Sequence, residues 1–221
     1  MSIVRTKIVK PYLLLCEGKD AEVFLLNYLE SEALSTDKRF SNDIQVLNFG
    51  GINDLDNYLM NLKNMENFEN VKSLAVIRDA EKNYTKACNE VANSFVRSID
   101  VSPESCGTWI RNDKGINAGY ILFPLNNNAG TLEDLCLQIL SENKGEDVLS
   151  AIETFLEEME ANHGRRYRRK HKNKLHTYLS TSEKYVTMLL GTASKAGAFD
   201  WSSMRLEPLK EFLFEGFDYT S

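Results

Sequence analysis

The chain has 221 residues, of which 43% are hydrophobic and 26% are charged, and its formal net charge is −6. This length and composition predict a single globular domain with a sizeable core, and they exclude a disordered chain. The acidic balance argues against general attraction to nucleic acid but is compatible with a local basic patch.

Apolar runs and helical patterns alternate through the first two thirds of the chain. The apolar runs predict strands at Tyr12–Cys16, Asp43–Phe49, Lys72–Asp79, Gly107–Arg111 and Gly119–Pro124. Helical spacing predicts helices at Asp20–Leu34, Asp54–Met65 and Asn83–Ile99, with Asn53 as the N-cap of the second. This alternation predicts an α/β fold with a mostly parallel central sheet and helices on both faces.

Only helices are predicted in the last third of the chain. They are expected at Thr131–Ser141, Glu146–Asn162, Lys170–Leu179, Glu183–Leu190 and Leu206–Phe214. We therefore expect an α/β core over residues 1–140 and a C-terminal helical extension over residues 141–221 that packs on the core. A basic segment at residues 165–174 is the one abrupt change in composition.

The cysteines and the apolar content restrict cofactors and location. The four cysteines are Cys16, Cys88, Cys106 and Cys136, and no two form a Cys-x-x-Cys pair, so we expect buried, reduced thiols and no zinc site. The first residues lack the apolar core of a signal peptide, and no run of about 18 apolar residues occurs. The sequence thus predicts a cytoplasmic protein that does not span a membrane.

Acidic residues follow two of the predicted parallel strands. Glu17 comes directly after the first strand, and Asp79 and Glu81 follow the third. Ligands of open α/β sheets bind beyond the carboxyl ends of the strands. In extended backbone Asp79 and Glu81 would point the same way, and carboxylate oxygens are the ligands that Mg²⁺ prefers. The alternative is that these acids are solvated or stabilise helix N-termini.

Several longer stretches carry a resemblance to a known family. They are CEGKDAEVFL (Cys16–Leu25), FGG (Phe49–Gly51), AVIRDAE (Ala75–Glu81), ILFPLNNNAGTLEDLCL (Ile121–Leu137) and KNKLHTYLS (Lys172–Ser180). With them the chain resembles a Toprim-like family of small bacterial proteins, the DUF3226 type. It also resembles the Toprim domains of topoisomerases, DnaG-type primases and OLD-family nucleases. The resemblance covers most of the chain and implies a Toprim-like Rossmannoid fold.

The resemblance implies roles for individual residues. Glu17 would be the Toprim glutamate, acting as a metal ligand or as a general acid or base. Asp79 and Glu81 would occupy the Asp-x-Asp pair, with Glu in the second place. Glu133 resembles a later acidic ligand of OLD-like nucleases. The lysine near the scissile phosphate would be Lys172 or Lys174, with Lys174 favoured.

The implied cofactor is Mg²⁺ or Mn²⁺. OLD-like nucleases often carry a further acid four residues after the Toprim glutamate, where this chain has Ala21, so the number of metal ions stays open. The assignment of Glu133 has a structural alternative, because Thr131 is a good N-cap and acids suit the first turn of a helix.

The basic segment predicts contacts with phosphate. Seven of the ten residues in RRYRRKHKNK are Lys or Arg. The expected nucleic-acid-binding residues are Arg165, Arg166, Arg168, Arg169, Lys170 and Lys172. A solvated loop without a ligand is the alternative. The histidines nearby lack HExxH spacing, so we assign them no zinc.

These features favour Mg²⁺-dependent phosphodiester cleavage of nucleic acid, with DNA as the favoured substrate. A topoisomerase would need a tyrosine-bearing cleavage domain, and a primase would need zinc-binding and helicase-contact parts. The main alternative is a catalytically weak or inactive module that binds nucleic acid or an ATPase encoded nearby, since the chain has no phosphate loop of its own. An aspartyl phosphatase ranks lower, because its motif usually follows the first strand. The oligomeric state is left open, with a homodimer among the options.

Overall fold

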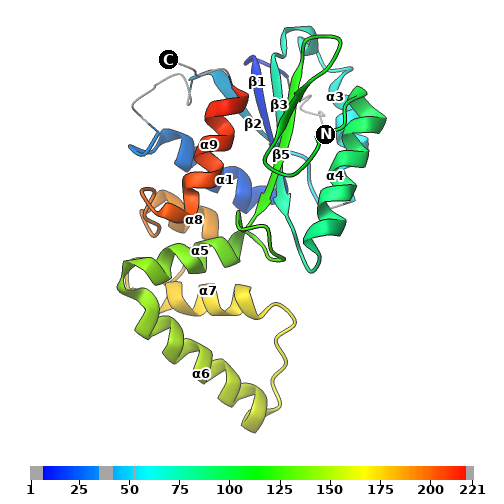
Figure 1. The fold of residues 1–221 in the computed structure, drawn as a ribbon. Coiled ribbons are helices and arrows are strands. Elements are labelled where there is room, and N and C mark those ends of the chain that lie inside the picture. The colour runs from blue at the N-terminus through cyan, green and yellow to red at the C-terminus, as the bar shows by residue number, and fades with distance from the viewer. Residues whose placement is uncertain (1–6, 35–41, 52, 218–221) are drawn as a thin grey trace, which may run out of the picture.

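The computed structural model describes residues 7–34, 42–51 and 53–217, and its strands form one five-stranded sheet (Figure 1). The strands are β1 (Tyr12–Cys16), β2 (Ile44–Asn48), β3 (Ser73–Asp79), β4 (Trp109–Arg111) and β5 (Asn117–Phe123). Their order is β2-β1-β3-β5-β4, and all pairs are parallel except β4 with β5. The predicted α/β fold with a mostly parallel sheet is confirmed.

The central strands are largely apolar because both faces of the sheet are covered. Alternate residues enter two different cores. Leu14, Cys16, Ala75 and Ile77 belong to one buried cluster, and Leu13, Leu15, Leu74 and Val76 belong to the other. This two-residue period is what separates the two helical layers.

Helices cover both faces of the sheet (Figure 1). One face carries α3 (Leu55–Leu62) and α4 (Tyr84–Ile99), and the other carries α1 (Gly18–Glu30), α8 (Leu190–Lys195) and α9 (Glu207–Gly216). Single 3-10 turns lie at η1 (Phe68–Asn70) and η3 (Met204–Leu206). The side chain of Asn83 caps α4 by accepting a hydrogen bond from the backbone N–H of Lys86 at 2.9 Å.

The remaining helices extend beyond one end of the sheet (Figure 1). They are α5 (Leu132–Leu140), a π-helical turn η2 (Ser141–Gly145), α6 (Glu146–His163) and α7 (Lys170–Ser180). Leu149 of α6 and Leu175 of α7 belong to the same buried cluster as Leu14 of β1. The helical extension therefore shares a core with the sheet.

Some local predictions were wrong. Residues 183–187 form turns, and the helix predicted there begins only at Leu190. The residue at the N-cap of α3 is Asp54, not Asn53, and its carboxylate accepts a hydrogen bond from the N–H of Gly51.

All four cysteines are free, but Cys88 and Cys106 are only half-buried. In the part of the chain that the structure describes, no helix has the length and apolarity needed to cross a membrane.

Candidate functional site

Glu17 and Asp79 lie at the carboxyl ends of adjacent parallel strands. The register pairs Cys16 of β1 with Ile77 of β3, and the backbone N–H of Glu17 donates to the carbonyl of Ile77 at 3.2 Å. The chain end of β1 is further fixed by Asn48, whose side-chain oxygen accepts a hydrogen bond from the N–H of Gly18. Strand pairing thus places the first two predicted acids at one edge of the sheet.

Asp79 connects this edge to α5. Its Oδ1 atom accepts a hydrogen bond from the backbone N–H of Leu132 at 2.9 Å, which holds the start of α5 over the end of β3. Burial raises the pKa of Asp79 to about 8, the nearby carboxylate of Glu133 adds to the rise, and the hydrogen bond from Leu132 opposes it. Glu17 and Glu81 add smaller increases. Asp79 therefore sits among acids with too little positive charge around it.

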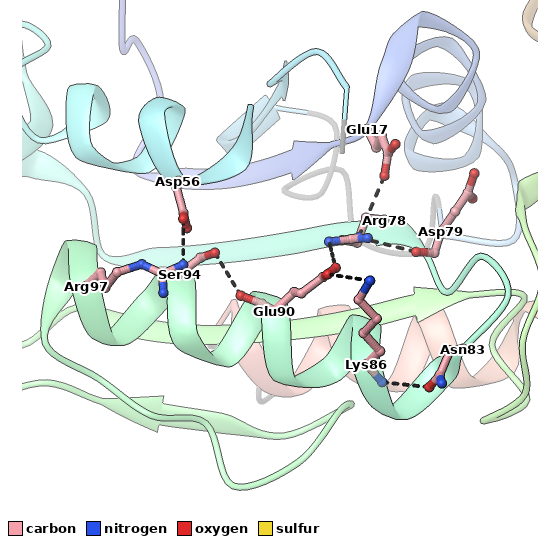
Figure 2. Close-up of polar contacts among 9 residues, drawn as sticks. All are labelled: Glu17, Asp56, Arg78, Asp79, Asn83, Lys86, Glu90, Ser94 and Arg97. Carbon is pink, nitrogen blue, oxygen red and sulfur yellow. Dashed lines mark hydrogen bonds and ion pairs between the residues drawn. The ribbon is translucent and has the colours of Figure 1, made fainter. Parts of the chain in front are cut away.

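Glu17 shares this lack of a full counter-charge. Burial raises its pKa, and the guanidinium of Arg78 opposes that rise. Nε of Arg78 is 3.7 Å from Oε2 of Glu17, which is ion-pair distance, yet this buried oxygen has no hydrogen-bond partner among the described residues. Figure 2 shows Arg78 between Glu17 and Glu90, to which it donates a hydrogen bond at 3.2 Å.

Glu133 has a cationic partner. Its Oε1 atom is 2.8 Å from Nζ of Lys172 on α7. Burial by itself raises the pKa of Glu133, but the hydrogen bond and charge of Lys172 more than offset it and hold the pKa below the ordinary value. The capping prediction for Thr131 is confirmed, since Thr131 and Asp134 form a capping box. Capping of α5 thus leaves the neighbouring Glu133 to bind Lys172.

The predicted extended backbone at Glu81, which would point its side chain the same way as that of Asp79, is wrong. The backbone is not extended there, because Glu81 has φ of +55° and exchanges hydrogen bonds with Gly130 at 2.8 and 2.7 Å. Its side chain is exposed. The charge of Glu81 nevertheless contributes to the raised pKa values of Glu17 and Asp79, so it lies at the rim of the acidic cluster.

The lysines of α7 face two directions. Lys172 reaches Glu133, whereas Lys174 pairs with Glu153 of α6 at 2.9 Å, as does Lys170 at 2.6 Å. Residues two apart on a helix are about 200° apart around its axis, so the two directions follow from the sequence spacing. The lysine beside the acids is Lys172, and the favoured Lys174 lies on the other side of the helix.

The arginines of the basic segment are exposed. Arg165, Arg166, Arg168 and Arg169 lie in the connection between α6 and α7. Within residues 7–34, 42–51 and 53–217, none of the four forms an ion pair with a carboxylate. The basic segment therefore divides into lysines that are paired with acids and arginines that are open to a ligand.

We tested whether the acids suit a divalent cation. Their oxygen donors are the right type for Mg²⁺ or Mn²⁺, and the unpartnered Oε2 of Glu17 is a buried acceptor that a cation would satisfy. As they stand, no three His, Cys, Asp or Glu side chains of the described residues are grouped closely enough to hold one ion. The chemistry fits a cation, and some rearrangement would be needed to bind it.

Ala21 stands where the resemblance predicts a further acid, four residues after Glu17, and its side chain is buried. It is 4% exposed and lies on the side of α1 that packs into the core. Asp20 accepts a hydrogen bond from the backbone N–H of Gly191, and Glu22 pairs with Lys19. Neither neighbour of Ala21 takes its place at the acidic cluster.

Sequence reasoning missed Arg78. This side chain is 2% exposed and lies beside Glu17. A signal was present, because an arginine inside the apolar stretch LAVIRD must have a buried partner. Lys172 was recognised only as one of two options, since residues 172 and 174 look equivalent until the position of α6 is known.

The fold and this cluster define a class of protein: an α/β protein with acids gathered at the carboxyl edge of a parallel sheet. Residues 11–218 match the family described as "Protein of unknown function (DUF3226)", and the chain belongs to that family. Neither the curated proteins nor the solved structures gave a match to this chain.

Proposed function

We propose that this protein is a Toprim-like, Mg²⁺- or Mn²⁺-dependent enzyme that cleaves phosphodiester bonds of nucleic acid, with DNA as the favoured substrate. The observation that supports it is the gathering of Glu17, Asp79 and Glu133 from β1, β3 and α5. The charges of Glu133 and Glu17 both raise the pKa of Asp79, and a buried carboxyl group among other acids favours a cation. A cluster of this kind beyond parallel strands is where α/β proteins bind ligands.

In this proposal the acids would hold the cation and the basic residues would hold the substrate. When bound, Mg²⁺ or Mn²⁺ supplies stabilisation of charge on the phosphoryl oxygens and lowers the pKa of a bound water. Asp79 and Glu133 would be its ligands, and Glu17 would be either a ligand or the group that accepts a proton from water. Arg78 would be a positioning residue, because its buried guanidinium lies at ion-pair distance from Glu17.

The phosphate of the substrate would meet Lys172 first. This ammonium group lies beside Glu133 and can neutralise a phosphate oxygen as negative charge develops in the transition state. The exposed arginines at positions 165, 166, 168 and 169 would bind backbone phosphates on either side of the reacting one.

A cleavage assay with two active-site variants tests this function. We expect Mn²⁺- or Mg²⁺-dependent cutting of single- or double-stranded DNA by the wild type, and a loss of at least about 100-fold in Glu17→Gln and Asp79→Asn, the scale for removing a catalytic group. Glu153→Gln is the matched control, because Glu153 pairs with Lys170 and Lys174 away from the cluster. Equal cutting by all four proteins would show that the activity does not come from this site.

A second candidate is a binding module without strong catalysis, acting on nucleic acid or with a partner ATPase. The pairing of Glu133 with Lys172 favours it, because the lysine already neutralises the buried carboxylate of Glu133. In that case the wild type would bind DNA in a salt-dependent way and show no cleavage with either metal. Addition of an ATPase encoded nearby then distinguishes an idle module from one that needs its partner.

A further inference from the structure

Among the residues that the structure describes, Lys172 forms an ion pair with Glu133, and part of its side chain is open to solvent. Its Nζ atom is 2.8 Å from Oε1 of Glu133, and the two side chains are 38% and 8% exposed. Its charge also acts on Glu17. One ammonium group therefore binds Glu133, and its charge also lowers the pKa of Glu17, while it remains within reach of a ligand.

A divalent cation and Lys172 compete for Glu133. A cation placed at Glu133 beside the ammonium group would meet a like charge in a poorly solvated place, where repulsion is strong. The oxygen that binds Lys172 would also have to turn toward the cation. Metal binding that uses Glu133 must therefore displace Lys172.

Phosphate offers Lys172 a second partner. Lys172 lies in the first turn of α7, three residues after the exposed Arg169. An ammonium group forms charge-assisted hydrogen bonds with phosphate as well as with carboxylate. A phosphate bound at the start of α7 would draw Lys172 away and leave Glu133 without a counter-charge.

We propose that Lys172 exchanges Glu133 for a substrate phosphate, so that a divalent cation and a phosphodiester bind cooperatively. The inference rests on the proposed function, because it takes the acidic cluster as the cation site. It adds an order to binding: the cluster accepts its cation well only when a phosphate is present. A protein built this way would hold little metal in the absence of nucleic acid.

Calorimetric titration of the full-length protein with Mn²⁺ tests the exchange. The phosphodiester probe is phosphorothioate-linked dithymidine, which resists cleavage. We expect the probe to raise the Mn²⁺ affinity of the wild type roughly ten-fold, a usual size for coupling between two sites. Without the probe, Lys172→Gln should already bind Mn²⁺ as tightly as the wild type does with the probe, and adding the probe should not raise its affinity further. Lys174→Gln should behave like the wild type, because Lys174 pairs with Glu153 of α6 and not with Glu133.

Thermal unfolding provides a second measurement on the same proteins. Lys172→Gln leaves Glu133 buried without a counter-charge, so without metal it should unfold at a lower temperature than the wild type, and Mn²⁺ should restore more of its stability. The exchange is overturned if the probe leaves the wild-type affinity for Mn²⁺ unchanged, or if Lys172→Gln binds Mn²⁺ no more tightly than the wild type.

The outcomes separate this inference from the proposed function. If none of the three proteins binds Mn²⁺, both the proposed metal-dependent function and the exchange of Lys172 are wrong. Cooperative binding in a protein that cuts no DNA would remove the nuclease function and leave the exchange in place. Cleavage without cooperativity would keep the enzyme and overturn the exchange.

Discussion

At the scale of single residues, Asp79 is a carboxyl group that the fold holds in an unfavourable place. Burial and the nearby acids raise its pKa from 3.8 to about 8. Between these two values the folded protein binds a proton at Asp79 and the unfolded chain does not. The free energy of unfolding therefore falls as pH rises from 3.8 to about 8. Sites of chemistry commonly reduce stability in this way.

Removal of this charge should stabilise the protein at high pH. We expect Asp79→Asn to raise the free energy of unfolding at pH 8 by about 1–2 kcal/mol, a usual gain for relieving such a site. The asparagine oxygen can still accept the hydrogen bond from Leu132, so the start of α5 is preserved. Urea unfolding in EDTA from pH 5 to pH 9 measures the effect, which should be smallest at pH 5.

Asp56 is the control with the opposite sign. Its hydrogen bond with Arg97 lowers its pKa, against a smaller effect of burial, so the ionised form stabilises the fold at pH values above 3.8. Asp56→Asn should therefore reduce stability at pH 8. If Asp79→Asn also destabilises the protein at pH 8, the fold stabilises the ionised carboxylate of Asp79, and its pKa is not raised.

At the scale of helices and strands, hydrophobic spacing predicted most of the fold. Strands β1 and β3 and helices α4 and α7 lie within one or two residues of their expected bounds, because apolar burial fixes them locally. The helix at Glu183–Leu190 was predicted from the same kind of spacing, but residues 183–187 form turns that lead into α8, which packs on α1. Tertiary packing overrode the local pattern there.

The candidate site was predictable only in part, for a related reason. Residues at strand ends are placed by the strands, so Glu17 and Asp79 could be brought together from the sequence. Glu81 could not be placed, because its left-handed backbone is set by pairing with Gly130 across a loop. The choice of Lys172 over Lys174 depends on which side of α7 faces α6, and spacing alone does not contain that information.

Helix capping gives a direct test at the same scale. We expect Asn83→Ala to lower the free energy of unfolding by about 1 kcal/mol, because it removes the side-chain acceptor for the N–H of Lys86 at the start of α4. Asn53→Ala is the matched control: Asn53 is exposed and does not cap α3, so stability should hardly change. Equal losses in both variants would mean that α3 uses Asn53 after all.

At the scale of the whole molecule, charge is distributed unevenly. The chain carries a net charge of −6, yet four exposed arginines lie together between α6 and α7, beyond the end of the sheet that holds the acidic cluster (Figure 1). Long-range repulsion from the acidic surface would oppose DNA, so binding should depend on this one connection. Such binding releases counterions and weakens steeply as salt is added.

Replacement of two arginines should change that salt dependence by a defined amount. We expect Arg166→Gln combined with Arg168→Gln to weaken binding of single-stranded DNA and to reduce the slope of log affinity against log salt by roughly 1.4, which corresponds to two lost phosphate contacts. The control replaces Lys63 and Lys114, which are equally exposed but lie at the end of α3 and in the turn between β4 and β5. It removes the same charge from the protein. If both double variants reduce the slope equally, net charge and not the basic connection governs binding, and the path proposed for the substrate past α7 is wrong.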